Sequence, residues 1–245
     1  MGAMEEGSGK VMRDIVKAHY EQDYKIGLED SPDETRRDMN RAIMEALRED
    51  RVHPPRILNV GSGPQLLERV LLMSYGSGQD PQLLKRTFFA TTDLAAIRSQ
   101  RLKAQKHDNV SHVRGDAETL PFAAESFGML ISNMAIDMMP RTAFGEAARS
   151  LVNGGLFVFT FHHPDMMRGI AAETTDPKVH EFVTRGLESG MYFETADDIR
   201  TTLAENHLLA EEISARRDSS KYSNSKWWFV RGVKNIDLPS AGNQS

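Results

Sequence analysis

A glycine-rich turn is the first feature of this sequence that could bind a ligand. The apolar run at 57–60 predicts a strand buried on both faces, and Gly61-Ser62-Gly63 then allows a tight turn that a ligand can approach closely. Pro64 fits the first turn of the helix predicted to follow. A strand, a glycine turn and a helix are typical of a nucleotide-type site, because the helix N–H groups point at the ligand. A plain strand-to-helix connection shows the same pattern, so the rest of the chain has to decide.

Two acidic residues follow later predicted strands. Asp93 comes directly after the strand predicted at 87–92, and Asp116 follows the strand predicted at 109–113. A carboxylate in such a place can accept charge-assisted hydrogen bonds from the polar groups of a nucleotide-type ligand. The alternative is that each aspartate caps a helix.

Two histidines, His162 and His163, follow the strongly β-prone run at 156–161. A histidine there could take a proton from a substrate as a general base. Because neighbouring side chains of an extended chain point to opposite faces, at most one of them is expected to enter a cleft. The alternative is a polar strand end at which Pro164 turns the chain. His163 and Asp165 could share a side, but two candidate ligands without a third are thin evidence, and we predict no metal.

Composition narrows the class of protein. The chain has 245 residues, a hydrophobic fraction of 40%, a charged fraction of 27%, a net charge of −5 and no cysteine. The fractions are typical of a globular domain, and the absence of cysteine excludes disulfides and thiolate metal sites and permits a reducing cytoplasm without proving it. The acidic balance argues against a nucleic-acid partner, and no apolar run is long enough to span a membrane.

The order of elements predicts an α/β fold with a seven-stranded, mostly parallel, doubly wound sheet. We expect a mobile leader at 1–9, an N-terminal helical cap at 10–55 and one domain at 56–234. A helical insertion at about 164–194 follows the fifth strand and serves as a lid, and a loose tail occupies 235–245.

Three local expectations are more specific. Residues 75–81 are predicted to form an exposed loop. The helix that carries Phe144 and Leu151 inward is expected to stop at Asn153-Gly154-Gly155. A capping box at 195–198 predicts the start of the next helix.

Four segments together resemble the motifs of class I S-adenosylmethionine-dependent methyltransferases, in the same order. They are Leu58-Asn-Val-Gly-Ser-Gly63, Thr92-Asp93-Leu94, Gly115-Asp-Ala-Glu-Thr-Leu-Pro-Phe122 and Leu151-Val-Asn-Gly-Gly-Leu-Phe-Val-Phe159. The resemblance covers about 56–161 and resumes at 195–232, and it is closest to small-molecule enzymes related to ubiquinone biosynthesis. Leu66 stands where a dinucleotide-binding motif would have its third glycine, which counts against a dinucleotide.

The resemblance implies S-adenosylmethionine as cofactor and S-adenosylhomocysteine as product. It implies that Asp93 holds the ribose and that Leu94, Asp116 and Ala117 contact the adenine. His162 or His163 is the candidate base. The implied cofactor-binding residues are Gly61, Ser62, Gly63, Asp93, Leu94, Asp116, Ala117, Asn133 and Tyr20.

The chain departs from the family pattern at two positions. Asn59 stands where family members usually carry an acid, which removes one negative contact toward the cationic end of the cofactor. Gln65 replaces a small residue and is expected to narrow the cleft. Both departures are expected to weaken cofactor binding.

The predicted function is methyl transfer to an O, N or C atom of an organic small molecule in the cytoplasm, by a monomer or homodimer. Two alternatives are an RNA or protein methyltransferase and a non-catalytic S-adenosylmethionine-binding module. The acidic balance and the sequence Ser132-Asn133-Met134-Ala135, in place of Asn-Pro-Pro-Tyr, argue against the first alternative.

Overall fold

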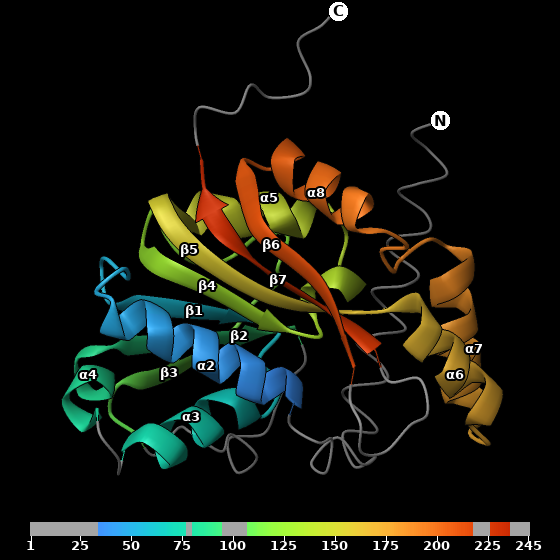
Figure 1. Cartoon of the computed structure of the whole chain (residues 1–245), viewed down its shortest axis with the longest axis horizontal. Helices are drawn as coiled ribbons and strands as arrows, with labels where there is room; N and C mark the ends of the chain where they lie inside the picture. The colour runs from blue at the N-terminus through green and yellow to red at the C-terminus, as the bar shows by residue number, and fades with distance from the viewer. Residues whose placement is uncertain (1–33, 77–79, 95–106, 218–225, 236–245) are drawn as a thin grey trace, which may run out of the picture.

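One sheet of seven strands organises the chain (Figure 1). The computed structural model describes residues 34–76, 80–94, 107–217 and 226–235. The strand order is β3-β2-β1-β4-β5-β7-β6, in which β7 runs antiparallel to β5 and β6 and all other neighbours are parallel. The prediction of a seven-stranded, mostly parallel sheet is confirmed. The strands are β1 (Arg56–Val60), β2 (Phe88–Asp93), β3 (Val110–Arg114), β4 (Phe127–Asn133), β5 (Leu151–His162), β6 (Leu208–Arg217) and β7 (Lys226–Lys234).

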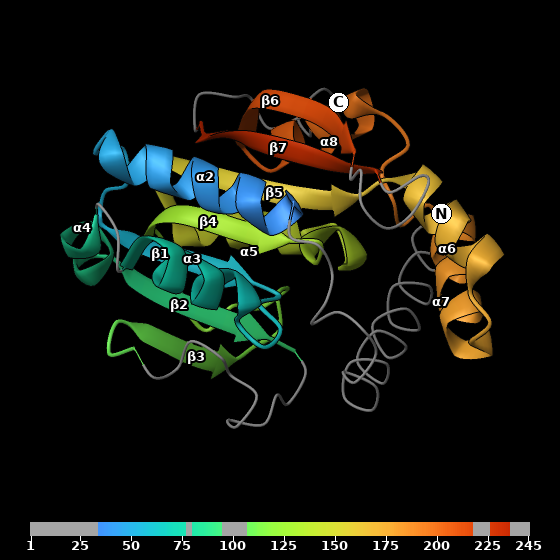
Figure 2. The ribbon, with the colours of Figure 1, turned by 60° about the horizontal axis from the view of Figure 1, so that its bottom comes forward.

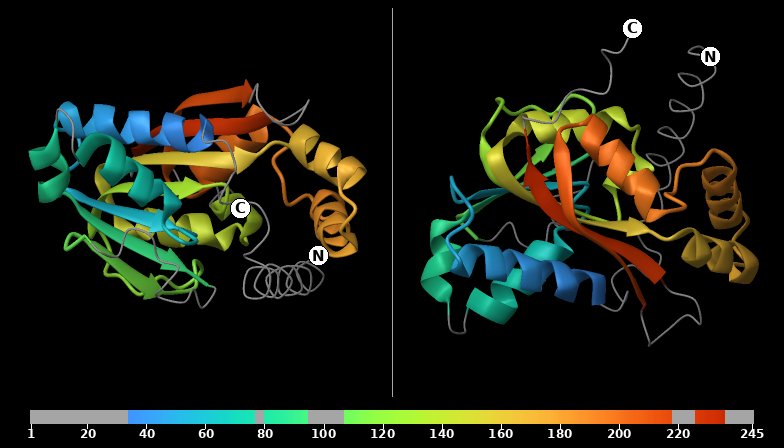
Figure 3. Two further views of the ribbon diagram at one scale, coloured as in Figure 1. Left: turned by 90° about the horizontal axis from the view of Figure 1, so that it is seen from below. Right: turned by 45° about the horizontal axis from the view of Figure 1, so that its top comes forward.

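Helices cover both faces of the sheet, as Figures 2 and 3 show. Helices α2 and α3 share one hydrophobic core with one face, and α5 and α8 share another core with the opposite face. The covering helices are α2 (Glu34–Arg48), α3 (Leu66–Gly76), α5 (Thr142–Ser150) and α8 (Ala196–Glu205), with a short α4 (Pro81–Arg86) beside α3. None of the described helices is long and apolar enough to cross a membrane.

Helix α2 is amphipathic and lies directly on the sheet. Met39, Ile43 and Leu47 recur every four residues and are almost fully buried. The hydroxyl of Thr160 in β5 lies 3.9 Å from the sulfur of Met39. Helix α2 belongs to the N-terminal helical cap expected at 10–55, of which residues 10–33 lie outside the described residues.

The predicted helical insertion forms two helices beyond the end of β5, α6 (Pro164–Glu173) and α7 (Pro177–Glu188) (Figure 1). They enclose a small hydrophobic cluster of their own, around Met167, Phe182 and Val183. The next helix, α8, begins with the capping box that the sequence predicted, since the side chains of Thr195 and Asp198 each accept a backbone N–H from the other.

Two of the local predictions are wrong. Helix α3 extends to Gly76 and α4 begins at Pro81, so most of the predicted loop at 75–81 that can be described is helical. Helix α5 ends at Ser150, and Asn153-Gly154-Gly155 lie inside β5, where the register with β4 shifts and Gly154 has a φ of 72°. The glycines signalled a turn, but pairing with β4 begins before them and continues after them through a bulge.

Candidate active site

The ends of β1, β2 and β3 are hydrogen-bonded to one another. The backbone N–H groups of Gly61 and Ser62 both donate to the carbonyl oxygen of Thr92 at 2.9 Å. The N–H of Gly63 donates to Oδ2 of Asp93 at 2.9 Å, and the N–H of Gly115 donates to the Asp93 carbonyl at 3.0 Å. Three segments that are far apart in the sequence therefore meet at the carboxyl edge of the sheet, where ligands of open α/β folds bind.

Both glycines of the turn have left-handed backbone angles, and one of them is also closely packed. Gly61 has a φ of 71°, and a Cβ atom on it would lie 2.5 Å from the Cβ of Ala135. Gly63 has a φ of 52°, which is again the left-handed region that glycine adopts most easily. The turn is thus packed closely against the segment that follows β4.

Two expectations about this turn are wrong. Helix α3 begins at Leu66, so Pro64 lies in the preceding turn and not in the first helical turn. Gln65, with a φ of 62°, is fully buried and donates from Nε2 to the Thr91 hydroxyl at 2.8 Å. Because this side chain is directed onto β2, it does not narrow the cleft.

The predicted adenine segment forms a tight turn after β3. Oδ1 of Asp116 accepts the backbone N–H of Glu118 at 3.1 Å, and the backbone of Asp116 pairs with Thr119. Ala117 is buried in the core. Leu94 is half-buried after β2, and its carbonyl accepts a hydrogen bond from Nε of Arg114 at 3.2 Å.

Asn133 stands at the end of β4, next to the glycine turn. Its Oδ1 accepts a hydrogen bond from the Thr160 hydroxyl at 2.8 Å, which holds the side chain against β5. The hydroxyl of the preceding residue, Ser132, donates to the carbonyl of Val60 at 2.8 Å. Tyr20, the remaining predicted cofactor residue, lies outside the described residues.

A buried aspartate that the sequence analysis missed holds His162. Asp137 lies in a short 3-10 helix, η3 (Ile136–Met138), and is 1% exposed. Its Oδ2 accepts the backbone N–H of His162 at 2.7 Å and lies 2.9 Å from Nδ1 of the imidazole. In the neutral ring this contact requires a proton on Nδ1, so the lone pair lies on Nε2, the nitrogen that could accept a proton. The only feature of the sequence that could have indicated Asp137 was that it is the one acidic residue in the otherwise apolar run at 134–139.

A second charged group lies near this dyad. The guanidinium of Arg141 lies 3.7 Å from the ring centre of Phe193 and donates to the carbonyl of Met191 at 3.0 Å. Burial lowers the pKa of Arg141, and the charge of Asp137 acts in the opposite direction. The ring of Tyr192 lies 5.8 Å from that of His162. Residues that precede α5 and α8 therefore lie near the dyad.

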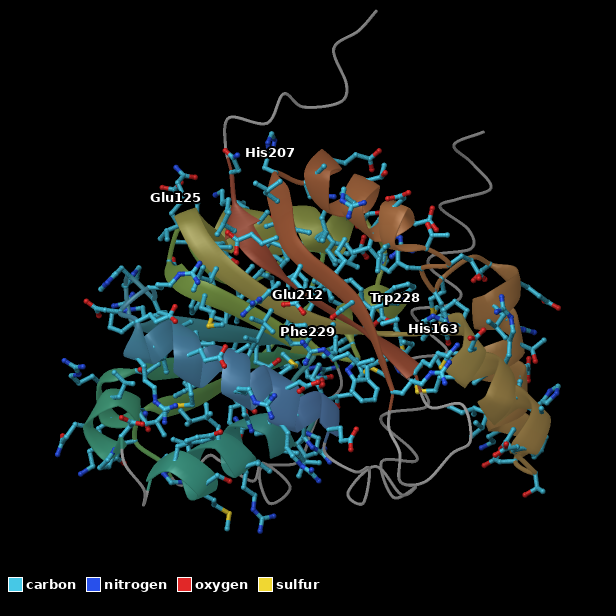
Figure 4. The ribbon with its side chains drawn as sticks, in the orientation of Figure 1. Glu125, His163, His207, Glu212, Trp228 and Phe229 are labelled. Carbon is cyan, nitrogen blue, oxygen red and sulfur yellow. The ribbon has the colours of Figure 1, made fainter. Side chains whose placement is uncertain are left out.

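His163 has a different environment. It is the N-cap of α6, where Nδ1 accepts the backbone N–H of Asp165 at 3.1 Å, and its ring packs on Trp228 at 4.9 Å (Figure 4). Burial lowers the pKa of His163, whereas the nearby charge of Asp165 raises it. Asp165 in turn accepts a hydrogen bond from Lys226. The described part of the chain contains no group of three or more His, Cys, Asp or Glu residues that could hold a metal ion.

Residues 71–159 match the family model of a methyltransferase domain. This segment of the chain is therefore similar to a methyltransferase domain. Among curated proteins, it is 30% identical over 127 residues to a malonyl-[acyl-carrier protein] O-methyltransferase of Chlorobium luteolum, covering 49% of this chain and 45% of the relative. It is 29% identical over 174 residues to the protein of the same name from a Methylovorus species, covering 68% and 56%. The chain thus spans about half the length of these relatives.

The fold of this chain is shared with solved structures. One is a Burkholderia thailandensis 1,6-didemethyltoxoflavin-N1-methyltransferase with bound 1,6-didemethyltoxoflavin and S-adenosylhomocysteine. The alignment covers 96% of this chain and 92% of that one, with a TM-score of 0.63 and 13% identity. At this identity the likeness establishes the fold.

Proposed function

We propose that this protein transfers a methyl group from S-adenosylmethionine to an organic small molecule and releases S-adenosylhomocysteine. The observation that carries the proposal is the hydrogen bond from Gly63 to Asp93, because it joins the glycine turn to the carboxylate expected to hold the ribose. The methyltransferase domain match at 71–159 supports it.

The side chains at the carboxyl edge fit this cofactor. Asp93 would hold the ribose, Leu94 and the turn at Asp116-Ala117 would hold the adenine, and Asn133 would lie near the amino-acid end. The hydrogen bond from Gly63 orients the Asp93 carboxylate before any ligand arrives. When bound, the cofactor supplies a methyl group on a sulfonium, whose leaving group is a neutral thioether.

The dyad of Asp137 and His162 suits an acceptor that loses a proton. Nε2 of His162 would take the proton from the acceptor oxygen or nitrogen as the bond to the methyl carbon forms. Asp137 would hold the ring in place and stabilise the resulting imidazolium, because its carboxylate is buried against Nδ1.

A second candidate acceptor is a free carboxyl group, which the names of the curated relatives favour because a malonyl group carries one. A carboxylate has already lost its proton at neutral pH, so it would need orientation and no base. The two candidates therefore differ in what they require of His162.

Calorimetry with S-adenosylmethionine and S-adenosylhomocysteine is the first test, and absence of binding by the folded protein at millimolar ligand would overturn the proposal. A screen of hydroxyl, amine and carboxyl acceptors for S-adenosylhomocysteine release then identifies the acceptor. Turnover only on RNA or protein would favour the macromolecular alternative, and binding with no turnover on any class would favour a non-catalytic module. A cytoplasmic location and a monomeric or homodimeric state remain predictions.

A further inference from the structure

We propose that Glu68 is a positioning residue for the cofactor and supplies, from beneath the glycine turn, the negative charge that Asn59 lacks. This inference rests on the proposed function, because it concerns the binding of the same cofactor. It assigns a role to a buried acid in α3 that lies outside the four motifs of the sequence.

The first support is a direct contact between the strand and the helix that the glycine turn connects. Nδ2 of Asn59, in β1, donates to Oε1 of Glu68 at 2.5 Å. The two residues are 2% and 1% exposed. Since Gly61 and Gly63 lie between them in the chain, this hydrogen bond closes the base of the turn.

The second support is that each residue of this pair has a buried oxygen atom without a hydrogen-bond partner among the described residues. These atoms are Oε2 of Glu68 and Oδ1 of Asn59. A buried polar atom without a partner costs stability, and an apolar pair of similar size would avoid that cost. An acid kept in such a place is therefore better explained by a role in binding than by a role in folding.

The third support is the location of the carboxyl group at the start of α3. Glu68 lies in the first turn of the helix, where the partial positive charge of the helix N-terminus favours an anion. Burial is the main cause that raises the pKa of Glu68 to about 7, while the hydrogen bonds from Asn59 and from its own backbone N–H act in the opposite direction. Near neutral pH a small change in local charge thus decides whether the carboxyl group is ionised.

Several other charged groups belong to the elements around α3. Asp93 in β2 and His112 in β3 lie on the side of the sheet that α3 covers. Arg36 is buried in α2. Lys85 and Arg86 of α4 are exposed. None of these charges is a cause of the raised pKa of Glu68.

The two cofactor forms differ by one charge, since S-adenosylmethionine carries a sulfonium and S-adenosylhomocysteine a neutral thioether. A cation above the turn favours the carboxylate of Glu68, and by linkage the carboxylate favours the cation. Raising the pH from 6 to 8 should therefore strengthen binding of S-adenosylmethionine relative to S-adenosylhomocysteine.

The test is calorimetry of both ligands at pH 6 and pH 8 with the wild-type chain, Glu68→Gln and the exchange variant Asn59→Asp/Glu68→Gln. Glu125→Gln is the matched control, because Glu125 precedes β4 at the opposite edge of the sheet (Figure 4). The ratio of the two affinities should rise about tenfold with pH in the wild type, the effect of one charge acting over on the order of 10 Å. Glu68→Gln should abolish this rise, and the exchange variant, which returns an acid to the same hydrogen bond, should recover the preference for S-adenosylmethionine.

The outcomes are separable. An unchanged pH dependence in Glu68→Gln, or an equal loss of affinity for both ligands, would overturn this inference and leave the proposed function intact. Absence of binding of either ligand to the folded wild-type chain would overturn both. If Glu68→Gln does not fold, the exchange variant provides the test. Its preference for S-adenosylmethionine over S-adenosylhomocysteine should exceed that of the wild type at pH 6. A preference no greater than that of the wild type at pH 6 would contradict the proposal.

Discussion

Oδ2 of Asp137 lies 2.7 Å from the backbone nitrogen of His162 and 2.9 Å from its Nδ1 atom. One buried carboxylate therefore determines both the position of a histidine at the end of β5 and the ring nitrogen that carries its proton. Such an arrangement is typical of a histidine that acts on a substrate through Nε2.

Replacing either member of this dyad should slow methyl transfer to an acceptor that loses a proton. His162→Ala removes the base, and Asp137→Asn removes the charge that stabilises the imidazolium. We expect a fall of about 10²-fold or more in single-turnover rate for each. His180→Ala is the control, because His180 is exposed on α7. Wild-type rates in both dyad variants would exclude the base and favour a carboxyl acceptor.

Removing the Asp93 carboxylate should strongly weaken cofactor binding. Asp93→Ala loses both the predicted ribose contact and the acceptor of the Gly63 N–H at 2.9 Å. Since charge-assisted hydrogen bonds are each worth roughly 1.5–3 kcal/mol, affinity should fall by about 100-fold or more in calorimetry. Circular dichroism should show an intact fold. Wild-type affinity in this variant would refute the ribose assignment.

Glu68 should make the protein less stable as the pH rises. Its pKa is about 7 in the folded chain and 4.5 in the reference state, so between these values the unfolded chain loses the proton and the folded chain keeps it. The contribution of the Glu68 carboxyl group to the free energy of unfolding is therefore fully present below pH 4.5. It decreases between pH 4.5 and about pH 7 and is lost above that. The full effect is on the order of 3 kcal/mol.

Urea unfolding at pH 5 and pH 8 measures this effect. Glu68→Gln should lose most of the difference between the two pH values, whereas Glu125→Gln should keep it. Equal pH dependence in the wild type and in Glu68→Gln would show that the buried carboxyl group is not the cause.

His163 should contribute to stability through the start of α6. His163→Ala removes the acceptor of the Asp165 N–H and the packing on Trp228, at a cost of about 1 kcal/mol in urea unfolding at pH 7. Because burial lowers the pKa of His163, its contribution is present above the unfolded pKa of about 6.5 and is lost as the pH falls through the folded pKa. The cost of the substitution should therefore be smaller at pH 5, and an equal cost at both pH values would contradict this.

Much of the fold could be predicted because its signals are local. Alternation of apolar strands and amphipathic helices predicted the sheet, and the box at Thr195 and Asp198 predicted the start of α8 correctly. Prediction was wrong where local signals conflict with pairing between strands. Asn153-Gly154-Gly155 suggest a turn, yet the hydrogen bonds of β4 and β5 carry them into a strand.

The candidate site was predictable where its residues follow strands, and not where a contact joins distant segments. Asp93 and Gly63 could be named from their motifs. The contact of Asp137 with His162 depends on how η3 packs on the end of β5, and neither residue shows it locally.

The sequence by itself determined the class of fold, because the alternation of strands and helices is encoded in short segments. From the glycine turn and the motifs it also predicted the edge of the sheet at which a ligand would bind and the class of that ligand. Only the tertiary structure decided which histidine pairs with a buried acid and which one caps a helix. It also decided that Gln65 is directed onto β2 and that Asn59 meets Glu68. The physical reason is that hydrogen bonding and burial depend on neighbours brought together by packing, and these neighbours are not adjacent in the chain.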